Sequence, residues 1–173
     1  MYGPIAETLR TQRLVLEPLA VHHADEMAPV LDDDRLHRYI GGEPLTPLEL
    51  RERYERLVAG PAPFHQESWL NWIVRRTRDG QAVGYVQATV RPESAGPVAS
   101  VAWVIAMPYQ GFGFATEAAR ALVSWLTANG VAGVTASVHP ANRASVAVAR
   151  KLGLRPTAET SGDETVWRLP RAD

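Results

Sequence analysis

Apolar and polar positions alternate in residues 13–19, and several later stretches are rich in aromatic and β-branched residues, and both patterns are typical of strands. They predict longer strands at residues 13–19, 69–76, 82–90 and 98–105, and shorter ones at 134–138 and 164–169. The tetrapeptide RDGQ between the second and third of these is typical of a hairpin turn. The strands at 69–76, 82–90 and 98–105 should therefore form an antiparallel meander.

A helical period appears between these strands. It predicts helices at residues 22–31, 35–40, 47–58, from 115 to a stop at Asn129-Gly130, and at 142–152. The third has clear N-terminal signals, with Thr46 as N-cap, Pro47 at the first helical position and Glu49 in the first turn. The segment GPAPFHQ after it has two prolines and a glycine, and is expected to be a loop.

The order of the later elements indicates the fold class. The last strand of the meander is followed by a glycine-rich turn, a helix, a strand and a second helix. Such an order implies a parallel crossover on an otherwise antiparallel sheet, so we expect an α/β protein with a mixed sheet. A chain of 173 residues suits one domain, which we expect to span residues 1–173.

Composition excludes several classes of protein. The net charge of -1 gives no basic surface for nucleic acid, so no nucleic-acid partner is expected. The absence of cysteine removes disulfides, thiolate metal sites and a cysteine nucleophile. No apolar run approaches the roughly 20 residues of a membrane span, and the first residues lack the apolar core of a signal peptide. The sequence therefore predicts a cytoplasmic protein without a membrane partner.

The pair His22-His23 is the one hint of a metal site. If both lie on the predicted helix, adjacent side chains point about 100° apart and cannot share an ion. No further cluster of histidine and acidic residues completes a site in the sequence, so no metal is expected.

The segment YQGFGFATEA, at residues 109–118, points to an anion site. Gly111 and Gly113 precede a helix, so several amide groups are free of shielding side chains at its positive end. A P-loop would need a lysine before Thr116, and a dinucleotide fingerprint would need a glycine or alanine at that position. A plain tight turn remains the alternative to a backbone cradle for phosphates.

Two further patterns carry a resemblance to a known family. PYQGFGFATEA resembles the acyl-CoA pyrophosphate loop of the GNAT superfamily of N-acetyltransferases, with Gln110, Gly113 and Ala115 at its defined positions. VHPANRASVAVARKLGL is similar to the second signature of that superfamily. The segments RLVLEPL and GYVQATV are similar to the branch that acetylates alanine and serine N-termini of ribosomal proteins.

The resemblance implies a mostly antiparallel central sheet, helices on both faces, and a parallel strand pair that splays to hold acyl-CoA. It also implies acetyl-CoA as the co-substrate and no metal. The residues that it assigns to coenzyme A are Val104, Ile105, Ala106, Gln110, Gly111, Phe112, Gly113, Phe114, Ala115, Thr116, Asn142 and Ser145. For Asn142 the alternative is a helix N-cap, a position that asparagine favours.

For catalysis the resemblance points to Ser145. Many relatives carry a tyrosine seven residues after the asparagine as proton donor to the thiolate, but Ala149 stands there and Ser145 is the substitute. The alternative is a helix serine that bonds its own backbone. The general base is less defined: relatives carry a glutamate where this chain has Ser137, and His139 is a candidate that could instead only shape its turn. Glu43, Glu67 and Glu93 cannot be ranked.

The acceptor is expected to be a primary amine. A site without a strong base suits an α-amine, whose pKa is about 7.7–8.0, better than a lysine near 10.4. A protein or peptide N-terminus is therefore the first hypothesis. A small-molecule amine such as a polyamine, an aminoglycoside or an amino acid is the second, and a non-catalytic acyl-CoA-binding regulatory protein is the third. Whether the chain forms a homodimer is left open.

Overall fold

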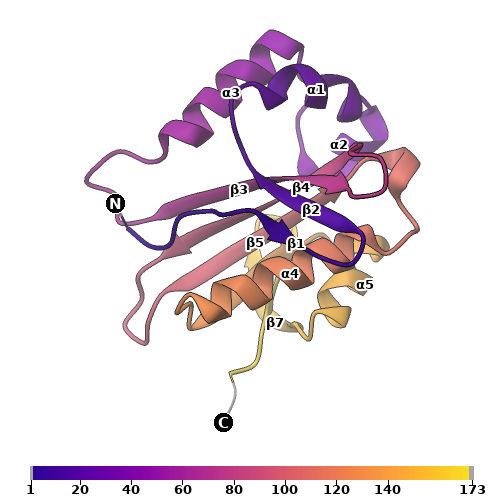
Figure 1. Cartoon of the computed structure of the whole chain (residues 1–173). Coiled ribbons are helices and arrows are strands. Elements are labelled where there is room, and N and C mark those ends of the chain that lie inside the picture. The colour runs from indigo at the N-terminus through magenta and orange to yellow at the C-terminus, as the bar shows by residue number, and fades with distance from the viewer. Residues whose placement is uncertain (1, 172–173) are drawn as a thin grey trace.

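A computed structural model describes residues 2–171 of the chain (Figure 1). Its centre is one sheet of eight strands in the order β1-β2-β3-β4-β5-β6-β8-β7. The strands are β1 (Leu9–Arg10), β2 (Leu14–Pro18), β3 (Ser68–Arg76), β4 (Ala82–Arg91), β5 (Val98–Ile105), β6 (Gly133–Val138), β7 (Arg155–Ser161) and β8 (Glu164–Arg168).

Helices cover both faces of the sheet, as Figure 1 shows. They are α1 (His23–Val30), α2 (Asp34–Ile40), α3 (Pro47–Ala59), α4 (Phe114–Ala128) and α5 (Arg143–Lys151), with a short 3₁₀ turn η1 (Met107–Tyr109). The larger hydrophobic core lies between the sheet and α4, and includes Trp72, Leu122 and Trp125. A smaller core lies under α1 and α3, and includes Met27 and Tyr54.

The strand pairing confirms the predicted mixed sheet. All neighbours pair antiparallel except β5 and β6, which are parallel and are connected through α4. The predicted meander is β3, β4 and β5, and the predicted strand at residues 98–105 matches β5 in full. Among the helices of residues 2–171, none combines the length and apolar character that crossing a bilayer requires.

The sequence signals at helix ends are also confirmed. Thr46 caps α3 through a complete capping box: its hydroxyl accepts from the Glu49 amide at 3.2 Å, and its own amide donates to the Glu49 carboxylate at 3.0 Å. Gly113 begins α4 in a left-handed conformation, with φ of 82°. Gly130, with φ of 87°, follows the C-cap residue Asn129 of this helix.

Two strands were not predicted, β1 and β7. β1 has only two residues, too few for a periodic pattern. β7 is an edge strand that pairs only with β8 and is exposed along most of its length. Its residues, RPTAETS, carry no alternation of apolar and polar positions, because almost none of them faces a core.

Candidate active site

The two parallel strands separate near the middle of the sheet. β5 pairs with β6 only from Val98 to Ser100, opposite Gly133 to Thr135. Beyond that point β5 continues to Ile105 and β6 to Val138 with no pairing between them. Both strands therefore present free backbone edges to the gap, and an extended ligand could pair with them there.

The turn that follows β5 exposes a run of amide groups. None of the described residues accepts a hydrogen bond from the amides of Gly111 to Thr116, and the first bond of α4 runs from Glu117 N to Gly113 O at 3.1 Å. Gly111 and Gly113 both have a positive φ, 87° and 82°. Consecutive unpaired donors at a helix N-terminus form an anion site, so this turn fits a pyrophosphate.

Gln110 has a structural partner inside this region. Its side-chain Nε2 donates to the Ile105 carbonyl at 2.8 Å, and this bond joins the turn to the end of β5. The glutamine side chain thus fixes the position of the glycine turn relative to the strand. The backbone of Val104 is buried in the β4–β5 ladder on its other side, where Tyr85 lies opposite it.

Arg13 is a basic neighbour of the turn that sequence reasoning missed. Its guanidinium lies over the Phe114 ring, 4.6 Å from the centroid, and its Nη2 lies 3.4 Å from where a Cβ on Gly113 would be. The Glu117 carboxylate holds Arg13 through Nε at 2.8 Å. Burial alone would raise the pKa of Glu117, but hydrogen bonds from Thr11 and Arg13 outweigh it, and the pKa is lowered. A fixed guanidinium here adds positive charge beside the unpaired amides.

Asn142 is the N-cap of α5, which was the alternative to coenzyme A binding in the sequence analysis. Its Oδ1 accepts from the Ser145 amide at 3.2 Å, which leaves Nδ2 without a partner among the described residues. Ser145 is half-buried, and no described residue bonds its hydroxyl, so the alternative of a bond to its own helix backbone is not met. Both free polar groups lie at the N-terminus of α5, directly after the loop that follows β6.

His139 is engaged at both ring nitrogens. Nδ1 accepts from the Ala141 amide at 3.0 Å, and Nε2 faces Asp163 at 3.4 Å. Its ring also packs on Tyr39 of α2, with 5.3 Å between centroids, and the Tyr39 hydroxyl donates to the Ala141 carbonyl at 3.2 Å. This geometry favours a role for His139 in shaping the turn and in contacting α2. The contact from Tyr39 has no sequence signal, because 102 positions separate the two residues.

The remaining candidate bases are dispersed. Ser137 is exposed on the open part of β6, and the residues that line the gap, 101–105 and 136–138, include no carboxylate and no imidazole. Glu67 accepts from the Trp69 indole at 2.7 Å, and Glu93 lies in the turn between β4 and β5. Glu43 is exposed, in the loop between α2 and α3.

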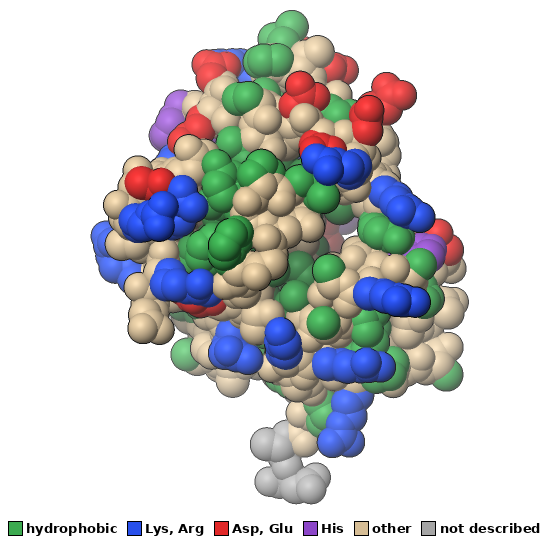
Figure 2. All heavy atoms as spheres, turned by 90° about the vertical axis from the view of Figure 1, so that its right-hand side faces the viewer, with side chains coloured by type: hydrophobic (Ala, Val, Ile, Leu, Met, Phe, Trp, Pro, Cys, Tyr) green, Lys and Arg blue, Asp and Glu red, His purple; other side chains and the backbone are tan. Residues whose placement is uncertain are grey.

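The side of the molecule where β5 ends and α4 begins faces the viewer in Figure 2. It has a hollow near its centre, and Lys and Arg side chains gather below and beside this hollow. A rim of positive charge attracts anions and suits a ligand that carries several phosphates.

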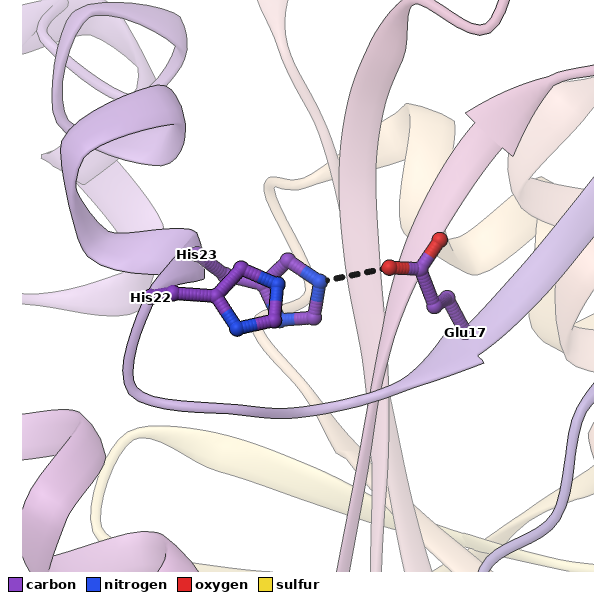
Figure 3. A group of neighbouring side chains, drawn as sticks. All are labelled: Glu17, His22 and His23. Atoms are coloured by element: carbon purple, nitrogen blue, oxygen red, sulfur yellow. Dashed lines mark hydrogen bonds and ion pairs between the residues drawn. The ribbon is translucent and has the colours of Figure 1, made fainter.

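Glu17, His22 and His23 form the group closest to a metal site, with ligand atoms within 4.8 Å of one another (Figure 3). The expectation that the two histidines point apart is wrong, because His22 is the N-cap of α1 and its ring lies 4.4 Å from that of His23. Metal binding is still disfavoured. His23 Nδ1 accepts from the Ala20 amide at 2.9 Å, so Nε2 carries the proton and donates to Glu17 at 2.7 Å. Neither nitrogen has a free lone pair.

Arg75 extends this group into an ion-pair network. Its Nε donates to Glu17 at 2.7 Å, and its terminal nitrogens bind Glu26 at 2.8 and 2.7 Å. Hydrogen bonds from Arg75 lower the pKa of both carboxyls below the ordinary 4.5, and His23 adds to the effect on Glu17. The network links α1 to β2 and β3.

We expect Arg75→Met to lower the free energy of unfolding by on the order of 1 kcal/mol at pH 7, because both carboxylates are partly exposed. The stabilisation is complete above about 4.5, the pKa of Glu17 and Glu26 in the unfolded chain. It is lost as the pH falls through their lower pKa values in the folded protein. The difference between the two proteins should therefore shrink below about pH 4 in urea titrations. Arg51→Met, which breaks one exposed pair with Asp25, is the control. A difference that stays constant down to pH 2 would contradict the network's role.

Gly84 fixes how closely β4 approaches β5. A Cβ at this position would overlap the Val104 carbonyl oxygen and lie 2.9 Å from the Ile105 Cα. We expect Gly84→Ala to destabilise the fold by about 1–3 kcal/mol, since backbone must move to relieve the contact. Gly133→Ala is the matched control, because its Cβ would meet only the two methyl groups of Val98, at 3.3 and 3.7 Å. Equal melting temperatures for the two variants would contradict the prediction.

Comparisons with known proteins agree with this geometry. A model of the acetyltransferase (GNAT) domain matches residues 13–155. An acetyltransferase from Agrobacterium tumefaciens str. C58 is 27% identical, with 99% of this chain and 98% of that chain covered and a TM-score of 0.70. A search of curated proteins gives no significant match.

Two other structures share the fold at lower identity. RimL, the ribosomal L7/L12 alpha-N-protein acetyltransferase solved with coenzyme A, is 15% identical over 94% of this chain and 97% of its own, with a TM-score of 0.78. AAC(6')-Ib, solved with paromomycin and acetyl-CoA, is 21% identical over 91% and 92%, with a TM-score of 0.73. The domain match covers most of the sequence, and the chain therefore belongs to the GNAT family of acetyl-CoA-dependent acetyltransferases.

Proposed function

We propose that this enzyme transfers the acetyl group of acetyl-CoA to the α-amine of a protein or peptide N-terminus. The observation that carries the proposal is the gap between β5 and β6. It opens beside the unpaired amides of the glycine turn, and the residues that line it include no carboxylate or imidazole to act as a general base. The acceptor side of the sheet is not filled, since a cavity lies between it and the helices α1 to α3. That cavity argues against a regulatory protein with a blocked acceptor site.

In this proposal the amides from Gly111 to Thr116 bind the pyrophosphate, and the Arg13 guanidinium adds charge beside them. The pantetheine arm lies along the end of β5 at Val104, Ile105 and Ala106, on the edge that has lost β6. The Ile105 carbonyl and the Ala106 amide already bond Gln110 and Val83, so the arm pairs with the remaining backbone groups of this edge. Asn142 can donate its unused Nδ2 to a pantetheine carbonyl while Oδ1 stays on the helix cap. The two functions of Asn142 are thus compatible.

The reaction proceeds by direct attack. The neutral amine nitrogen forms a bond to the thioester carbonyl carbon, the carbon–sulfur bond breaks, and the amine loses a proton to solvent. The departing thiolate takes a proton from the Ser145 hydroxyl, which regains one from solvent and has no other described partner. No covalent enzyme intermediate is needed. We assign no base to His139, because Ala141 and Asp163 face both its nitrogens.

An α-amine fits this site because of its pKa. At pH 7 an α-amine with a pKa of about 7.7–8.0 is neutral to a useful extent, whereas a lysine near 10.4 is neutral in fewer than about one molecule in a thousand. With no carboxylate or imidazole along the gap, only an amine that deprotonates in water reacts readily.

The proposal is tested by competition within one substrate. A peptide with a free α-amine and one lysine is acetylated for a single limited turnover, and fragments are mapped by mass spectrometry. We expect acetyl on the α-amine in large excess. Acetyl mainly on the lysine would mean that a base has been missed. Reaction only with a polyamine or an aminoglycoside would replace the substrate class and leave the chemistry unchanged.

Three further points stay proposals. We propose that residues 1–173 form one acetyltransferase domain, supported by the single sheet that runs through the described chain. We also propose a cytoplasmic location, as the composition predicts, and a homodimer as the assembly that a molar-mass measurement in solution would test.

A further inference from the structure

A cavity that is partly open to solvent lies on the face of the sheet that α1, α2 and α3 cover. Its volume is about 200 Å³. Its floor is formed by β3 and β4, and its walls by the helices and the loop between α2 and α3. The apolar lining includes Leu31, Leu45, Leu50, Leu57 and Ile73.

The cavity lies one strand away from the gap where acetyl transfer is proposed. Tyr85 and Gln87 of β4 line it, and in the sheet register they lie opposite Val104 and Ala102 of β5. Paired residues on neighbouring strands project from the same face of a sheet. A group bound in the cavity is therefore next to the part of β5 that has lost its pairing with β6.

The charges around the cavity do not suit a polycation. Its lining has one carboxylate, the exposed Glu43, and that negative charge is offset by Arg53. Burial raises the pKa of both lining tyrosines, Tyr54 and Tyr85, so they stay neutral phenols. A polyamine or an aminoglycoside carries several ammonium groups and would need several carboxylates, whereas this lining has one.

Two carboxamides provide the polar part of the site. Asn71 and Gln87 lie directly opposite each other on β3 and β4 and both line the cavity. Neither side chain has a hydrogen-bond partner among the described residues, although both are half-buried. Two free carboxamides on the floor of the cavity can bind the N–H and C=O groups of a peptide bond.

Building on the proposed N-terminal acetyltransferase activity, we propose that this cavity binds the first side chain of the acceptor and selects a large apolar residue. Asn71 and Gln87 bind the first peptide group and direct the α-amine toward β5. An apolar cavity of about 150 Å³ is known to hold a benzene molecule, so about 200 Å³ accommodates one leucine, methionine or phenylalanine side chain. It is below the roughly 300 Å³ at which pockets for whole drug-sized ligands begin.

The test compares peptides that differ only in their first residue, which is Ala, Ser, Leu, Met or Phe, with a common remainder that lacks lysine. We expect kcat/KM for Leu, Met or Phe to exceed that for Ala or Ser by about 10- to 100-fold, because single methylenes already give 10-fold or more in apolar pockets. A preference for Ala or Ser would overturn this inference and leave the proposed function intact. If no peptide reacts and small polyamines do, both the proposed N-terminal acetyltransferase activity and the selection of an apolar first residue are wrong.

Two variants connect the preference to the cavity. Ala28→Leu fills it from α1, and the ratio of kcat/KM for Leu-first over Ala-first peptides should fall about tenfold or more. Leu45→Ala enlarges it from a loop and should raise the ratio for Phe over Leu. Ala121→Leu, on α4 at the opposite face, is the control and should leave both ratios unchanged. Equal ratios in all three variants would overturn the assignment of the cavity.

Discussion

A Gly113→Val variant should fold but bind acetyl-CoA at least about a hundredfold more weakly than the unchanged chain. Gly113 is the left-handed N-cap of α4, with φ of 82°, and its neighbours expose the unpaired amides. A valine in this conformation is strained by roughly 1–3 kcal/mol. Its branched side chain would also occupy space beside the amides that the pyrophosphate needs, where only Arg13 now approaches at 3.4 Å.

The expected loss has two parts that calorimetry and melting curves separate. Strain at Gly113 lowers the melting temperature, whereas loss of the anion site lowers acetyl-CoA affinity. Gly130→Val is the matched control, because Gly130 has nearly the same φ, 87°, at the other end of the same helix and nothing lies within 4 Å of its Cβ. The control should lose stability and keep its affinity. Unchanged affinity in a folded Gly113→Val protein would show that the pyrophosphate binds elsewhere.

The arrangement of this fold could be predicted well from sequence because its strands and helices carry strong periodic signals. The strand at 98–105 alternates half-buried and buried positions over residues 98–101, and α3 has Thr46, Pro47 and Glu49 at its start. Local patterns of this kind fix the element type and its ends. β7 shows the limit: an exposed edge strand is held by pairing to β8 alone, which leaves no mark on its own residues.

The same limit holds within the site. The glycine turn and the signature around Asn142 lie in short continuous segments, so the sequence predicts them. Arg13 could not be found, because it depends on Glu117, which is 104 positions away. The prediction that His22 and His23 point apart was wrong because it placed both residues inside the helix. His22 is instead the N-cap of α1, and from that position its ring lies beside that of His23.

The apolar cavity was also beyond the sequence. Its lining comes from α1, α2, α3, β3, β4 and a loop, and each contributing residue looks like ordinary core in its own segment. Only the packing of the helices on the sheet leaves a space there. Asn71 and Gln87 gain meaning in the same way, because they become neighbours only through the register of β3 and β4.

The second large effect is expected at Ser145. Ser145→Ala should lower kcat by about ten- to a thousandfold with little change in acetyl-CoA affinity, because proton donation to a leaving group is typically worth 10²–10⁴. The substitution keeps the helix cap, since Asn142 accepts from the Ser145 backbone amide and not from its hydroxyl. Stability should therefore change little.

Ser124→Ala removes an exposed hydroxyl from α4 and serves as the control, with kcat and stability both expected to stay the same. Ser145→Thr keeps a hydroxyl and should therefore be faster than Ser145→Ala. A purely structural role of the serine would not predict that the hydroxyl restores the rate. A donor thioester with a more acidic thiol needs less help from a proton donor, so Ser145→Ala should be less impaired with such an acyl donor than with acetyl-CoA. If Ser145→Ala turns over at the unchanged rate with acetyl-CoA, solvent protonates the thiolate, and the serine is only a residue of α5.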